Sequence, residues 1–401
     1  MVQTAPAATP RLLPARLVAP AVGLLTFVIY AVASLGKSTG WNAHSRLAWA
    51  MLHGSFSLSP PYGTWELITD AAGHHFIAYG PTASFLLLPF VWLFGAATNQ
   101  TLVSCLFGAV AVAFWWAYLE QAGTTLSARS WLTILCAGGT SFFFYAAQDG
   151  GNWGIPYTVA ILGLMVALWA GSVRRPLLAG LATGAAIMSR NPELFLVPAI
   201  AMQLLAPDAE SWREVRIDWP KLVRFAVGLA ILGAILAYYN WARFGSVFDN
   251  GYQRLWLTDP LGDFGRRPLF SLAYAAHEIP FYLTAPPIWL GRFPWLGAGQ
   301  AGLSMLLVTP VLWLLPFVNY RKPANLVALA CALAVQALYF VFAGDGRNQF
   351  GMRYTLDYLV MVLLLVTSLT RERFGLGPRV LTVLGILVEI WGFVSWHAMG
   401  W

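Results

Sequence analysis

Two carboxylates in the run WELITD are spaced for shared chemistry. Glu66 and Asp70 lie four residues apart, so on a helix both side chains would point from one face. A carboxylate close to hydrocarbon loses hydration, which raises its pKa, and a raised pKa suits a general base working near neutral pH. Most carboxylates in loops are plain surface groups, so the same pair also fits a solvated loop. Both interpretations stay open on spacing alone.

Two adjacent histidines follow this acidic pair. His74 and His75 come close enough to Glu66 and Asp70 to raise the hypothesis of a metal site. Adjacent side chains of an extended chain point to opposite sides, however, and no metal-ligand spacing is repeated here. A role in the loop without metal is therefore the better-supported interpretation of the two histidines.

Charged residues in two further turns have both a structural and a functional interpretation. Asp149 lies in the turn QDGGNWG, where it would cap a helix or serve as a second residue of a site. Arg190 lies in SRNPE, and Glu193 three residues later is its natural ion-pair partner at membrane depth. Capping and pairing are the simpler interpretations for these two turns.

The run GDGRNQFGMRYTLDY, residues 344–358, contains two arginines near the start of an apolar block. Arg353 would pair with Asp357 four residues later, as on a helix face. Alternatively, Arg353 and Arg347 would clamp a phosphate, because a guanidinium presents a fork of donors to phosphoryl oxygens. The sequence does not decide between an ion pair and a phosphate site.

The elements that must position these residues are membrane helices. The chain has 401 residues, of which 58% are hydrophobic and 10% charged, with a mean hydropathy of +0.64. A soluble domain carries about 25% charged residues, so this chain has too few to cover a soluble surface. Apolar blocks such as 17–36, 101–119 and 352–370 approach the roughly 20 residues that cross hydrocarbon as a helix. The net charge of +7 lies in short loops, which indicates membrane topology and excludes a nucleic-acid partner.

We predict an all-α polytopic protein with one transmembrane domain, residues 1–401, and about eleven transmembrane helices. The apolar segment 79–97 is expected to be re-entrant or juxtamembrane, because most Lys and Arg of the short loops then share one side. That side is expected to be the cytoplasm, which also holds the N-terminus. The outer face is expected to carry the two long loops 37–98 and 241–299. The spans are expected at 17–36, 99–120, 129–147, 155–172, 176–190, 191–206, 221–240, 300–319, 325–343, 352–370 and 379–399.

Three stretches in order resemble one family. Residues 65–90 (WELITDAAGHHFIAYGPTASFLLLPF) contain an acid and an aromatic-Gly-Pro that enters an apolar helix. Residues 239–252 (YNWARFGSVFDNGY) resemble an Asn-x-x-Arg-Phe-Gly pattern, and residues 350–358 (FGMRYTLDY) resemble an Arg-Tyr-x-x-Asp pattern. Together they resemble the GT-C superfamily of integral-membrane glycosyltransferases. The likeness is greatest to a bacterial branch that is distantly similar to protein O-mannosyltransferases and aminoarabinose transferases.

The resemblance implies an inverting transfer of a sugar from a polyprenyl-phosphate donor to a hydroxyl of a glycan, lipid or protein. The site would face the outside of the plasma membrane, among membrane lipid, and would need no cofactor, with a divalent metal left open. Glu66 or Asp70 would be the base, since Asn42 stands where many members have an early Asp. Two further groups of residues are implied. The lipid phosphate would bind Arg243, Arg353 and Arg347, and the cavity would be lined by Asp149, His74, His75, Tyr79 and Tyr354.

Two other classes of protein remain as alternatives. A transporter or flippase of a lipid-linked glycan usually shows repeated halves and charges midway along its helices, and this sequence shows neither clearly. A non-catalytic subunit of an envelope-assembly complex would explain why Asn42 replaces an acid. Substitution of Glu66 and Asp70 distinguishes these classes, because a scaffold tolerates both changes.

Overall fold

The computed structural model describes residues 15–59, 66–257, 268–344, 346 and 349–399. Within these residues, six helices are long and apolar enough to cross a membrane. The long apolar helices form because uninterrupted runs of Leu, Val, Ala and aromatic residues satisfy every backbone group internally. They are α4 (Gln100–Gln121), α7 (Gly154–Ser172), α10 (Trp219–Phe244), α14 (Pro323–Phe340), Arg353–Thr370 and α16 (Leu376–Met399).

The other predicted spans are helical but shorter or interrupted, so the expected number of spans is not confirmed. The span predicted at 129–147 is interrupted at residues 139–141, and the one at 300–319 becomes a 3-10 helix over Pro310–Phe317. Proline removes a backbone donor, which explains the second interruption. The elements concerned are α1 (Ala15–Ala33), α5 (Leu126–Gly138), α6 (Phe142–Ala147), α8 (Pro176–Ser189), η2 (Asn191–Leu196), α9 (Val197–Leu205), α13 (Met305–Val308) and η4 (Pro310–Phe317).

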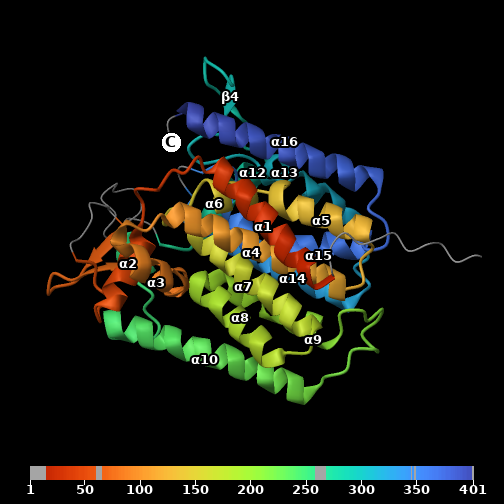
Figure 1. Cartoon of the computed structure of the whole chain (residues 1–401), viewed down its shortest axis with the longest axis horizontal. Helices are drawn as coiled ribbons and strands as arrows, with labels where there is room; N and C mark the ends of the chain where they lie inside the picture. Colours follow the sequence, from red (N-terminus) through yellow and green to blue (C-terminus); the bar gives the residue numbers. More distant parts are fainter. Residues whose placement is uncertain (1–14, 60–65, 258–267, 345, 347–348, 400–401) are drawn as a thin grey trace, which may run out of the picture.

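The bundle has two ends of different character (Figure 1). At one end, here called the short-loop end, ion pairs tie neighbouring turns together: Arg371 to Asp208 at 2.6 Å and Lys322 to Glu210 at 2.6 Å. The other end, here called the loop end, carries α2, α3 and the C-termini of α1, α10 and α16. The helices alternate in direction, so turn 148–153 and residues 341–344 also reach the loop end.

The first long loop folds into a small subassembly at the loop end. Helix α2 (Ala43–Leu52) packs against α3 (Thr82–Phe94), which continues into η1 (Gly95–Ala97), and a hairpin of β1 (Leu67–Thr69) and β2 (His75–Ile77) lies between them in the chain. The hairpin is antiparallel with Ile68 opposite Phe76. Helix α3 has 13 residues, which span only about 20 Å against roughly 30 Å of hydrocarbon. It is therefore too short to cross as a straight helix.

The second long loop forms α11 (Tyr252–Leu257), η3 (Leu272–Tyr274), α12 (Ala275–Thr284) and a hairpin of β3 (Ile288–Trp289) and β4 (Leu296–Gly297). The last span combines η5 (Arg353–Tyr358) with α15 (Leu359–Thr370), which is the most buried of the long helices. Helices α10 and α16 expose most of their apolar side chains, as expected of helices at the edge of a membrane bundle. At the loop end, every residue of η5 is buried, and η5 packs against the largely buried α7.

Candidate active site

Glu66 is held inside the protein at the start of strand β1. Only 1% of its surface is exposed. One carboxylate oxygen accepts a hydrogen bond from the Tyr79 hydroxyl, and the other accepts from the Asn152 side chain at 2.8 Å. Burial raises the pKa of Glu66, while these hydrogen bonds and the charge of Arg353 lower it. Glu66 is thus a carboxylate with an elevated pKa that sits among fixed donors.

The hairpin explains why Tyr79 reaches Glu66. Leu67 pairs with Ile77 across the two strands, so Glu66 and Tyr79 both lie just beyond the end of the ladder, where the Tyr79 hydroxyl donates to Glu66. Gly80 then brings the chain onto the end of α8: a Cβ at this position would lie 1.9 Å from the carbonyl oxygen of Met188. Only glycine allows that approach, which accounts for the glycine in the Tyr-Gly-Pro run.

Arg353 lies in η5 on the far side of the same centre. Its guanidinium carbon is 5.6 Å from the ring centre of Trp153 and 5.5 Å from that of Tyr354. A small cavity lies between these groups, lined by Tyr79, Asn152, Arg353 and others. The Arg353 charge lowers the pKa of both Glu66 and Asp149, although burial raises each of them more. One arginine therefore lies within electrostatic reach of two carboxylates.

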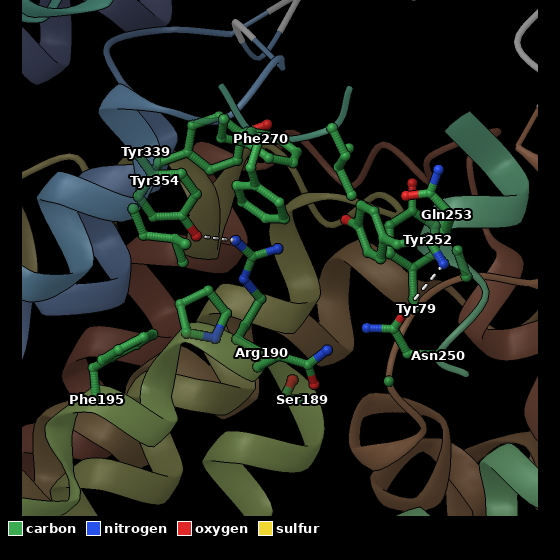
Figure 2. A pocket seen from close by; sticks show the side chains of 17 residues that line it. Tyr79, Ser189, Arg190, Phe195, Asn250, Tyr252, Gln253, Phe270, Tyr339 and Tyr354 are labelled. Atoms are coloured by element: carbon green, nitrogen blue, oxygen red, sulfur yellow. Dashed lines mark hydrogen bonds between the residues drawn. The ribbon is translucent and has the colours of Figure 1, made fainter. Parts of the chain in front are cut away.

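A larger cavity of about 380 Å³ opens beside Arg190 (Figure 2). Arg190 donates to both Asp357 oxygens at 3.0 and 2.8 Å, and to the hydroxyls of Tyr157 and Tyr339. We call this space the aromatic cavity, because its wall is mainly aromatic and aliphatic. It is lined by Tyr79, Tyr252, Leu269, Phe270, Leu338, Tyr339, Phe342 and Tyr354 together with polar residues around Arg190.

A second cavity of about 350 Å³ lies at the ends of α1, α4 and α16. We call it the polar cavity, because its wall carries Lys37, Thr39, Asp149 and His397. Asp149 accepts from the backbone N–H of Gly151 at 3.1 Å, and α7 begins later at Gly154 without a side-chain cap. The capping interpretation of Asp149 is therefore wrong, and its carboxylate faces a cavity.

The remaining predicted residues lie elsewhere. Asp70 and His74 form an exposed pair at 2.9 Å in the hairpin turn, with His75 beside them. Segment 66–70 is a strand and turn, so the shared helix face expected of Glu66 and Asp70 does not exist.

No cluster of three His, Cys, Asp or Glu that could hold a metal occurs in the described part of the chain. Arg243 donates to the carbonyl of Ile77 at 2.5 Å and stacks on Tyr239, so it joins α10 to the hairpin. Arg347 lies outside the described residues.

Two ion pairs inferred from local spacing are wrong. Asp357 pairs with Arg190, so the i, i+4 partnership of Arg353 and Asp357 is replaced by a contact between distant segments. Glu193 is buried, and neither of its oxygens has a hydrogen-bond partner among the described residues. A bidentate arginine fork prefers a carboxylate in its plane, and Asp357 occupies that position.

Sequence reasoning missed Asn152, Tyr157 and Tyr339 as members of the site. Asn152 donates to Glu66 and accepts the Ala43 backbone N–H at 2.8 Å, which ties two loops together. Its place in the run QDGGNWG beside Asp149 was the available signal. The two tyrosines sit within apolar helices and carry no local signal of a polar role.

This architecture is similar to that of solved structures of other proteins. No protein-family model matches the sequence, and no curated protein matches it. The structure is similar to the apo oligosaccharyltransferase of Archaeoglobus fulgidus, with a TM-score of 0.50, 14% identity, and coverage of 95% of this chain and 56% of that one.

Two further solved structures are similar at lower scores. For ArnT from Cupriavidus metallidurans bound to undecaprenyl phosphate the TM-score is 0.45, with 15% identity over 88% of this chain and 59% of that one. For the A. fulgidus oligosaccharyltransferase AglB with an inhibitory peptide and a dolichol-phosphate it is 0.42, with 12% identity over 94% and 55%.

These findings show that the chain has a fold similar to that of the A. fulgidus oligosaccharyltransferase. The chain spans little more than half the length of the oligosaccharyltransferase that it resembles. It is a mostly helical multi-pass membrane protein. At its loop end, a small cavity lined by Arg353 and by the partners of Glu66 shares lining residues with each of two larger cavities.

Proposed function

We propose that the protein is a glycosyltransferase that moves a sugar from a polyprenyl-phosphate donor to a hydroxyl acceptor with inversion at the sugar carbon. The observation that carries this proposal is the arrangement at the loop end. The buried Arg353 and the two hydrogen-bond partners of the buried Glu66, Tyr79 and Asn152, line one small cavity that adjoins the aromatic cavity. A base and a phosphate ligand are the two groups that such a transfer requires.

The donor lies in the aromatic cavity. Its aromatic and aliphatic wall matches an isoprenoid chain, and its inner end meets the small cavity at Tyr79, Arg190, Tyr252 and Tyr354. We place the phosphate beside Arg353, because Arg353 lines the small cavity into which the inner end of the aromatic cavity leads. A guanidinium in a site sheltered from water stabilises the charge that develops on the leaving phosphate.

The acceptor hydroxyl is deprotonated through Tyr79 and Glu66. The acceptor oxygen forms a bond to the sugar carbon while the bond from that carbon to the phosphate oxygen breaks. The acceptor proton passes to the Tyr79 oxygen, and Tyr79 gives its own proton to Glu66, with which it is already hydrogen-bonded. The polyprenyl phosphate leaves with the bonding electron pair. The loop end faces the outside of the membrane, where lipid-linked donors replace nucleotide sugars.

The test is glycosyl transfer by the purified protein in lipid nanodiscs, with radiolabelled polyprenyl-phosphate sugars and an envelope acceptor fraction. We expect Glu66→Gln to lower turnover by about 100-fold or more, the usual contribution of a positioned base. Asp70→Asn is the matched control, because Asp70 lies in an exposed turn of the same hairpin. Equal loss in both variants, or full activity in Glu66→Gln, would overturn the assignment of the base.

A further inference from the structure

The polar cavity has no role in the donor chemistry proposed above. It lies between the linker 37–41, the turn 148–153 and the end of α16. Its volume of about 350 Å³ falls at the small end of the roughly 300–1,000 Å³ typical of small-molecule sites. Trp153 lines both this cavity and the small cavity that contains Arg353. A molecule bound here would therefore lie next to the reacting groups, across from the aromatic cavity.

The wall of the polar cavity combines indole faces with fixed polar groups. Trp41 and Trp153 face one another with ring centres 5.2 Å apart and planes tilted by 41°. Lys37 lies 3.2 Å from a ring nitrogen of His397, and Thr39 accepts the backbone N–H of Trp41 at 3.0 Å. These internal contacts hold the side chains in place before any ligand arrives, which lowers the entropic cost of binding.

The described residues of this wall include no Leu, Ile or Val, in contrast with the aromatic cavity. A lipid chain would gain little there, because it binds by burying apolar surface. A sugar ring fits better. Its hydroxyls bond to carboxylate, ammonium and hydroxyl groups, and its C–H face rests on an indole whose π face is weakly negative.

We infer that the polar cavity is the acceptor site and that the acceptor presents a sugar ring, packed against Trp41 and hydrogen-bonded to Asp149. The assignment of this cavity as the acceptor site rests on the proposed function, whereas the binding of a sugar ring does not. Trp41 is suited to the contact because 39% of its surface is exposed while its neighbour Trp153 fixes its orientation.

Direct binding tests the inference without turnover. Methyl glycosides of hexoses, pentoses and N-acetylhexosamines are titrated into the protein in nanodiscs, and saturation-transfer NMR reports bound sugar. We expect at least one glycoside to bind, and Trp41→Ala to weaken it by about tenfold, which equals about 1.4 kcal/mol. Asp149→Asn is a second variant for the case in which Trp41→Ala fails to fold. Trp289→Ala is the matched control, because Trp289 lies on the exposed β3–β4 hairpin and does not line the cavity.

Each outcome separates this inference from the proposed function. Glycoside binding that depends on Trp41, without turnover of any donor, supports the sugar site and contradicts the glycosyltransferase proposal. Donor turnover without binding of any glycoside overturns the sugar site and leaves the glycosyltransferase. Binding that survives both Trp41→Ala and Asp149→Asn also overturns the site, as does transfer to a peptide that no binding glycoside inhibits. In the supporting case, Trp41→Ala raises the acceptor KM more than it lowers kcat.

Discussion

At the scale of single residues, the proposed chemistry requires one buried carboxylate, Glu66, to accept a proton. Burial favours the neutral form of Glu66 and raises its pKa. Hydrogen bonds from Tyr79, Asn152 and Trp153 and the charge of Arg353 oppose that effect. The balance leaves the pKa above that of an ordinary glutamate. A base with such a pKa works in its charged form only where the pH exceeds it.

The pH dependence of turnover follows from this balance. Turnover should rise as the pH rises through the raised pKa of Glu66. The acidic limb of the kcat–pH profile should therefore have its midpoint above the ordinary pKa of a glutamate. Asn152→Ala removes a hydrogen bond that stabilises the carboxylate, so the Glu66 pKa rises further and the limb should move up by about one pH unit. The measurement is kcat against pH for wild type and variant.

Asn325→Ala is the control for this experiment. Asn325 is also a buried asparagine with side-chain hydrogen bonds, but it bonds to Asn319 and Ser368, toward the short-loop end. The acidic limb of the kcat–pH profile of Asn325→Ala should coincide with that of the wild type. A limb that stays in place in Asn152→Ala would exclude Glu66 as the titrating base.

At the scale of elements, the β1–β2 hairpin positions Glu66, the proposed base. It presents Glu66 and Tyr79 side by side, and its exit is fixed where Gly80 touches the last turn of α8. Arg243 ties the same hairpin to the C-terminal end of α10. Glu66, the proposed base, is thus held by a short strand pair fixed to two helices, and movement of the strand pair would misplace it.

Gly80→Ala tests this attachment. The new Cβ would overlap the Met188 carbonyl oxygen, so the hairpin must shift, and we expect a loss of stability of about 1–3 kcal/mol together with reduced turnover. Gly233→Ala is the matched control, since Gly233 in α10 has open space around it and alanine favours a helix. Unfolding in detergent, followed by circular dichroism, measures the stability of both variants, and the glycosyl-transfer assay measures their turnover. Equal stability of the two variants would refute the attachment.

At the scale of the whole molecule, the two ends of the bundle differ in structure. The short-loop end is joined by ion pairs between neighbouring turns, among them Arg371 with Asp208 and Lys322 with Glu210. The loop end holds both large cavities and the small one between them. Basic short loops favour the cytoplasm, which is why the loop end is proposed to face outward.

Labelling of introduced cysteines tests this orientation. Ser246→Cys lies at the loop end and Arg213→Cys at the short-loop end, and both positions are exposed. A membrane-impermeant thiol reagent added to intact cells should label the first and leave the second unlabelled until the cells are permeabilised. The native residues Cys105, Cys136 and Cys331 are buried and should give no background. The reverse labelling pattern would place the active site in the cytoplasm.

The sequence by itself determined the membrane character, most helical segments and the two central charges of the site. Long apolar runs specify helices because hydrocarbon offers no other partner for the backbone, and that requirement is local. Glu66 and Arg353 were identifiable because each stands in a polar run next to an apolar block, within a motif that resembles GT-C enzymes. Asp149 was visible for the same reason, although its local interpretation as a cap was wrong.

Only the tertiary structure decided which groups are partners. Glu66 and Asn152 are 86 positions apart, and Arg190 and Asp357 are 167 positions apart. Local spacing instead paired Arg353 with Asp357 and Arg190 with Glu193, because i, i+3 and i, i+4 rules describe a single helix. Inside a bundle, a buried charge is satisfied by whichever helix packs against it, and that choice depends on packing over the whole chain.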